Sequence, residues 1–111
     1  MDVTARWLDV EHRELDHALA EVEFLAERRA FDPAARRFHE FRERFLAHLE
    51  TEEADPKVAE VVKPAHARLL AALDAVTSAL DRHDYAEFSS GVTALGKLVA
   101  AHERDEEALA R

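Results

Sequence analysis

Two short segments of this chain share one pattern that can bind a metal ion. The first contains His48 and Glu52, and the second, 54 residues later, contains His102 and Glu106; both segments read A-H-x-x-x-E-E. On an α-helix, residues four positions apart lie on the same face, so each segment aims one imidazole and one carboxylate at a common point. Two such points, brought together inside a helical bundle, would hold metal.

The repeat extends well beyond these segments. The same shift of 54 residues superposes His12 on His66, and ten of the 42 aligned positions from His12 to Glu53 are identical. The first and second histidines of each half are 36 residues apart. Equal spacing is expected of two helical hairpins whose arms return their histidines to the same level. The two halves together supply six candidate metal ligands, which are His12, His48, Glu52, His66, His102 and Glu106.

All six candidates fall on helix faces that otherwise carry Leu, Phe and Val, so we expect them to be buried. Each buried imidazole or carboxylate without a partner would cost several kcal/mol. Ion pairing among the six would satisfy some of them, whereas two divalent cations would satisfy all. The chain has no cysteine, so only nitrogen and oxygen donors are present. Imidazole suits Fe, Zn, Cu and Ni, and bridging carboxylates favour a dinuclear site with Fe or Mn.

Other chemistries known in helical bundles fit these residues less well. Ferritin-like di-iron proteins use Glu-x-x-His on two helices, and that spacing occurs here once, at Glu14 and His17. A haem held by two histidines would leave Glu52 and Glu106 without a role. Cysteine is absent and serine is scarce, so no nucleophile is indicated. A helical interaction module without metal is the remaining alternative.

Five further residues resemble the candidates in type but not in position. His17 and His39 fall on outer helix faces, and His83 falls in a turn. Glu53 and Glu107 repeat with the motif but lie one position off the buried stripe. We expect the three histidines to take no part in metal binding. We expect the two glutamates to be solvated or to contact a ligand residue without binding the metal themselves.

The composition is typical of one helical domain spanning residues 1–111. Hydrophobic residues make up 48% and charged residues 35%, with two Gly and three Pro. The formal net charge of -9 disfavours binding to nucleic acid or to anionic lipid. Neither a signal peptide nor an apolar run of roughly 20 residues is present, so we expect a cytoplasmic protein. Arg outnumbers Lys by twelve to three, which is typical of a GC-rich bacterial genome.

Hydrophobic periodicity predicts four helices. The first is expected over about Thr4–Arg29, and the second follows Asp32 as its cap, with Pro33 in the first helical position. The fourth follows Asp84, which has the spacing of a capping box. Short connections then favour an all-α, up-down-up-down antiparallel bundle built from two repeated hairpins.

The beginning of the third helix is less well defined by the sequence. Asp55 and Pro56 form another start signal, and Pro64 marks either a break or a position in the first turn. Residues 54–63 are therefore expected to form a short extra turn or the bent beginning of the third helix.

The order of these motifs resembles the hemerythrin-like (HHE cation-binding) family, in its branch with four His and two Glu. The resemblance covers nearly the whole chain. It implies a four-helix bundle around two non-haem iron ions, with the two Glu as bridging ligands, the His as terminal ligands, and a bridging oxygen species. The segments that carry it are Glu11-His12-Arg13-Glu14-Leu15, His48-Leu49-x-x-Glu52-Glu53, His66-Ala67-Arg68-Leu69 and His102-x-x-x-Glu106-Glu107.

One departure from the oxygen-carrying members of that family bears on function. They have a second His four residues after the third-helix His, where this chain has Leu70, and their final carboxylate is an Asp five residues after the last His. Here Asp105 and Glu106 stand at three and four residues. Asp16, at the repeat position that matches Leu70, is a candidate extra ligand or a hydrogen-bond acceptor for a ligand His.

Three functions follow as expectations. The first is a protein that binds O2, peroxide or NO at a di-iron site for sensing, scavenging or storage. The second is a di-iron enzyme that decomposes peroxide or performs an O2-dependent oxidation. The third is an iron-handling protein. The residues show no acid or base beyond the candidate ligands, which favours simple O2 or peroxide chemistry over an elaborate substrate.

Overall fold

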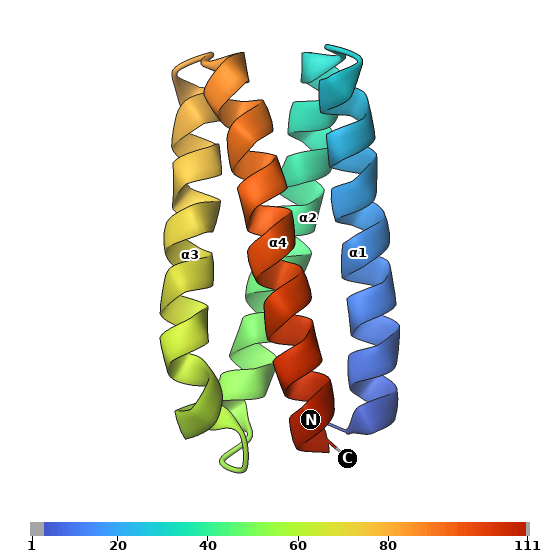
Figure 1. Cartoon of the computed structure of the whole chain (residues 1–111), viewed down its shortest axis with the longest axis vertical. Helices are drawn as coiled ribbons and strands as arrows, with labels where there is room; N and C mark the ends of the chain where they lie inside the picture. Colours follow the sequence, from blue (N-terminus) through green and yellow to red (C-terminus); the bar gives the residue numbers. More distant parts are fainter. Residues whose placement is uncertain (1–3, 111) are drawn as a thin grey trace.

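Four antiparallel helices account for most of residues 4–110, the part of the chain that the computed structural model describes. They are α1 (Ala5–Glu27), α2 (Phe31–Ala54), α3 (Ala59–Asp81) and α4 (Tyr85–Ala110). They run alternately up and down, and both chain ends lie at the same end of the bundle (Figure 1). α1 and α3 each pack against α2 and α4. The expected all-α bundle is thus confirmed; residues 1–3 and 111 of the expected domain lie outside the described part.

Each helix buries one stripe of its surface in a common core. Side chains of Leu, Val and Phe fill that core along most of its length, and four fully buried phenylalanines, Phe38, Phe41, Phe45 and Phe88, are its largest members. Burying an aromatic or aliphatic side chain of this size stabilises the fold by roughly 1.5–3 kcal/mol. Among the described helices, none is both long enough and apolar enough to cross a membrane.

The two hairpins turn in the same way, which extends the repeat to the loops. Arg29 and His83, 54 residues apart, have positive φ angles of 60° and 55°. After Arg29, the N–H of Ala30 donates to the carbonyl of Leu25 at 2.9 Å, and an equivalent bond closes the second hairpin. This is the Schellman pattern, in which a residue in the left-handed region ends the helix and satisfies its last carbonyls.

The start of α2 corrects one expectation from the sequence. α2 begins at Phe31, so its cap is Ala30 and not Asp32, and Ala30 makes no side-chain capping bond. In α4 the repeat-related cap, Asp84, accepts a hydrogen bond from the N–H of the third helical residue. The third residue of α2 is Pro33, which has no N–H. A capping side chain would therefore find no donor there.

In the connection from α2 to α3, residues 55–58 form a short turn and α3 follows directly, so the short turn is the alternative found for residues 54–63. α3 begins at Ala59, after a turn that starts at Asp55. The Asp55 carboxylate accepts a hydrogen bond from the N–H of Lys57 at 2.9 Å, and its carbonyl accepts one from the N–H of Ala59 at 3.0 Å. Asp55 therefore shapes the turn and does not cap the helix. Pro64 lies inside α3, which continues through it.

Replacing Arg29 by Gly is expected to raise the free energy of unfolding by about 0.5–1 kcal/mol. A left-handed backbone costs a residue with a Cβ roughly 1–2 kcal/mol, and the greater freedom of Gly in the unfolded chain offsets about half of that gain. Urea unfolding of the metal-free protein measures the change. Arg29→Ala removes the same guanidinium but keeps a Cβ, so it should show no gain; equal stabilisation by both variants would contradict the backbone explanation.

Candidate metal centre

All six candidate ligands meet in the core, toward the end of the bundle that carries the chain termini. No more than 6% of any of them is exposed. The histidines lie at the same level along the bundle axis because the turns of the two hairpins are equivalent and both halves have the same spacing between their histidines. α1 contributes one of them, α3 one, and α2 and α4 two each; they are His12, His48, Glu52, His66, His102 and Glu106.

Their donor atoms divide into two groups that share one carboxylate. Within each group, the donor atoms all lie within 4.8 Å of one another. Each group contains the two histidines of one hairpin, and both groups contain Glu106. This buried His/Glu cluster can therefore hold metal. The groups are His12, His48 and Glu106 on one side, and Glu52, His66, His102 and Glu106 on the other.

Glu52 also faces both pairs of histidines. Its Oε1 lies 2.9 Å from His66 Nε2 and 3.5 Å from His102 Nε2. Its Oε2 lies 3.3 Å from Nε2 of His48, which belongs to the histidine pair of Glu52's own hairpin. One carboxylate thus directs its two oxygens to opposite sides of the centre.

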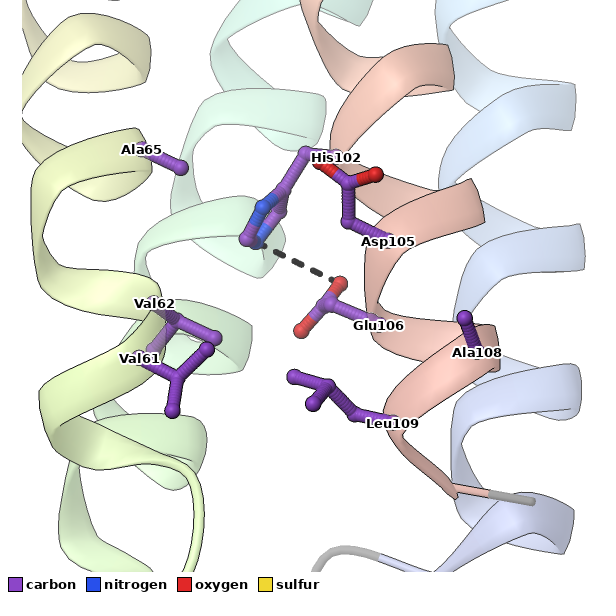
Figure 2. Close-up of a pocket in the computed structure, with 8 residues that line it drawn as sticks. All are labelled: Val61, Val62, Ala65, His102, Asp105, Glu106, Ala108 and Leu109. Atoms are coloured by element: carbon purple, nitrogen blue, oxygen red, sulfur yellow. Dashed lines mark ion pairs between the residues drawn. The ribbon is translucent and has the colours of Figure 1, made fainter.

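Glu106 occupies the corresponding position on α4 and lies closest to the histidine of α1. Its Oε1 is 3.1 Å from His12 Nε2, 3.3 Å from His102 Nε2 and 3.8 Å from His48 Nε2. Figure 2 shows the Glu106 carboxylate beside the His102 ring. Both carboxylates therefore stand between the two histidine pairs.

The charges of the cluster suit a cation. Burial raises the pKa of Glu52, but its close contacts with the imidazoles of His102, His48 and His66 outweigh burial, so its pKa lies well below the usual value. Burial, together with the charge of His48, lowers the pKa of His12. Glu52 Oε2 and His102 Nε2 are buried without a hydrogen-bond partner among the described residues. An anionic carboxylate and free donor atoms aimed at the same interior fit a bound metal ion.

Two glutamates contact the Nδ1 nitrogens of histidines in the opposite hairpin. Glu53 Oε2 accepts from His66 Nδ1 at 3.0 Å. Glu107 Oε1 lies 3.5 Å from His12 Nδ1. These are repeat-related contacts, and each links one hairpin to the other. Burial lowers the pKa of His66, but its hydrogen bonds to Glu52 and Glu53 raise the pKa above the usual value.

Two contacts on His48 were not expected from the sequence. The ring of Trp7 stacks on the ring of His48, with centroids 4.8 Å apart and planes 7° from parallel. Glu11 Oε1 lies 3.7 Å from His48 Nδ1, and Arg44 donates to the other oxygen of Glu11 at 2.8 Å. The sequence places Trp7 and Glu11 near His12 on α1, but only the packing of α1 on α2 brings them to His48.

The histidines expected to lie outside the centre do so. His17 is exposed and pairs with Glu21, His39 is exposed, and His83 lies in the second hairpin turn. Leu70 is 37% exposed, at the edge of the bundle. The position where oxygen carriers place another His therefore carries an apolar side chain that is partly open to solvent.

Comparison of the chain with protein-family models, with curated proteins and with solved structures found no match. The four-helix bundle and its buried His/Glu cluster are compatible with the hemerythrin-like resemblance. The function must therefore be argued from the residues of the site.

Asp16 and Glu103 form a carboxyl pair next to this centre. Asp16 belongs to neither group of donor atoms and is hydrogen-bonded to Glu103. Burial, together with that hydrogen bond, raises the pKa of Glu103 to about 9, so Glu103 is a neutral acid at pH 7. The sequence interpretation missed Glu103 because it directly follows His102 and lies off the stripe that carries the candidate ligands.

Glu103→Gln is expected to raise the free energy of unfolding of the metal-free protein, relative to wild type, more at pH 8 than at pH 5. The pKa of Glu103 rises from 4.5 to about 9 on folding, so the folded state holds the proton more tightly. Its contribution to the free energy of unfolding is therefore present below pH 4.5 and is lost as the pH rises toward 9. A neutral amide avoids that loss, and we expect a difference of at least about 1 kcal/mol between the two pH values.

Urea unfolding at pH 5 and pH 8 measures this effect. The control is Glu50→Gln, because Glu50 is an exposed residue of the same type on α2. The same pH response in wild type, Glu103→Gln and Glu50→Gln would show that Glu103 ionises normally in the folded protein.

Proposed function

We propose that this protein is a non-haem di-iron protein that binds O2 or a related small ligand, such as peroxide or NO, for sensing, scavenging or storage. One observation carries the proposal. Two pairs of buried histidines, one from each hairpin, face two shared carboxylates, Glu52 and Glu106. Such an arrangement could hold an ion beside each pair, with each carboxylate in reach of both pairs.

The donor set as a whole suits iron. Imidazole alone would suit several transition metals, but two shared carboxylates add hard oxygen donors. No thiolate is present to favour zinc, since the chain has no cysteine. The resemblance to the hemerythrin-like family, in the order and spacing of the six residues, also supports iron. When bound, an iron pair supplies open coordination positions and two electrons for a small ligand.

The residues of the chain take distinct parts in this proposal. Glu52, Glu106 and the four histidines would hold the ions. Glu53 accepts a hydrogen bond from Nδ1 of His66, which would hold the ring proton there and make Nε2, now 2.9 Å from Glu52 Oε1, a more basic ligand for an ion. Phe45 lies against His48 with ring centroids 6.4 Å apart. Together with the apolar core next to it, Phe45 excludes water from the side of His48 that faces the middle of the bundle.

The double variant Glu52→Gln/Glu106→Gln is expected to lose both irons while it keeps the helical fold. The amides preserve size but remove the two negative charges that would bind the ions. Metal analysis and the visible absorption spectrum of protein expressed with added iron measure the loss, and circular dichroism verifies the fold. Wild type should hold two irons per chain.

The matched control is His17→Ala/His39→Ala, which removes two exposed imidazoles and should retain both irons. Retention of two metals in the glutamine variant would refute the ligand assignment. A wild-type protein that holds no metal after iron-supplemented expression would refute the proposed function itself.

The spectrum of the iron-loaded protein then separates the possible roles. A reversible change on addition and removal of O2 indicates storage. Rapid conversion to a stable ferric form by O2 or peroxide indicates sensing or scavenging. Steady consumption of excess peroxide would assign the protein to the enzymes instead.

A further inference from the structure

A cavity of about 350 Å³ opens beside the centre, between α3 and α4. His102 and Glu106 form its polar wall, and Val61, Val62 and Leu109 form much of its apolar wall (Figure 2). A second cavity, of about 250 Å³, shares Val62, Glu106 and Leu109 with the first. Both cavities therefore reach the centre next to Glu106.

The opposite side of the centre, between α1 and α2, is covered. Trp7 stacks on His48 there, and Glu11 stands at the outer nitrogen of His48. Arg44 holds Glu11 in place through a contact of 2.8 Å. His48 is 2% exposed, and neither of the two cavities described above is lined by His48 or His12.

The difference between the two sides comes from two pairs of repeat-related positions. Trp7 corresponds to Val61 and Glu11 corresponds to Ala65, each pair being 54 residues apart. Val61 and Ala65 both line the larger cavity, and Val61 is 59% exposed at its rim. The ligand residues thus follow the repeat, whereas the residues that cover them do not.

We propose that an exogenous ligand reaches this centre from one side only, through the cavity between α3 and α4, and binds beside His102 and Glu106. The proposal rests on the proposed metal centre. Trp7 blocks the equivalent approach beside His12 and His48, because its ring occupies the space that Val61 leaves open on the other side.

The lining of the cavity favours a neutral ligand with an apolar body. Apolar side chains form most of the wall, whereas Asp105 and Glu106 supply negative charge. In the adjoining cavity Asp55 and Glu106 outnumber Lys57, so an anion gains no net attraction there either. A volume of about 350 Å³ is roughly ten times that of a water molecule in the liquid. It admits O2 or NO and has room for a molecule of several carbon atoms.

Exchange of the repeat-related residues tests the one-sided path. Val61→Trp places an indole at the open rim, and Trp7→Val removes the cover on the closed side. NO serves as a neutral probe, and its association with the anaerobic ferrous protein is followed by stopped-flow absorption. We expect Val61→Trp to slow association by at least about tenfold, and Trp7→Val to leave the rate unchanged or raise it.

Ala65→Leu narrows the same cavity with a smaller change and keeps the test valid if the indole variant does not fold. Metal content, measured for every variant, must equal that of wild type. An unchanged association rate in both Val61→Trp and Ala65→Leu would overturn the proposal. A rate lowered equally by Trp7→Val and Val61→Trp would also overturn it.

A second measurement uses metal-free protein, so its result does not depend on the proposed function. Diethylpyrocarbonate modifies accessible imidazoles, and mass spectrometry of peptides reports the rate at each histidine. Val61→Trp should protect His102 relative to wild type, and Trp7→Val should expose His48. If Val61→Trp leaves His102 unprotected, the one-sided path is refuted even where iron binds; if the protein holds no iron but both shifts occur, only the metal assignment fails.

Discussion

Buried charge is the constraint on which this structure depends. Two carboxylates and four imidazoles lie in a helical core with almost no exposed surface, and each would cost several kcal/mol without a partner. Hydrogen bonds within the cluster satisfy part of that need, but Glu52 Oε2 and His102 Nε2 are still without a hydrogen-bond partner among the described residues. The rest of the bundle, with its four buried phenylalanines and continuous apolar stripes, stabilises a fold that retains this unfavourable group.

Neither hairpin contains a complete site. Glu52 belongs to the first hairpin but makes its shortest contact with His66 in the second, and Glu106 reaches back to His12. The supporting contacts of Glu53 and Glu107 cross between hairpins in the same way. The shortest histidine contact of each carboxylate therefore joins the two halves, so that packing of the hairpins and assembly of the site are one event.

Much of this could be predicted from the sequence, because periodicity and a constant shift depend only on helix geometry. The four helices and the common level of His12, His48, His66 and His102 follow from that geometry. The start of α2 could not be predicted, since Asp32-Pro33 carries a start signal whose exact register depends on the preceding turn. The placement of Trp7, Glu11 and Glu103 could not be predicted either. Their contacts are with side chains on other helices, and such contacts depend on how the helices pack.

The two ends of the bundle differ in a way that bears on its motions. At the end away from the termini, Phe31 stacks on its repeat partner Tyr85 with ring centroids 4.3 Å apart, and the layers beneath are apolar. At the other end, the helices surround charged groups and two solvent-open cavities. Amide protons near Phe38 and Val92 should therefore exchange with solvent only when the whole chain unfolds, whereas those near Val62 and Glu106 exchange through local opening. The end of the bundle that carries the buried His/Glu cluster is therefore also the end where local opening is expected.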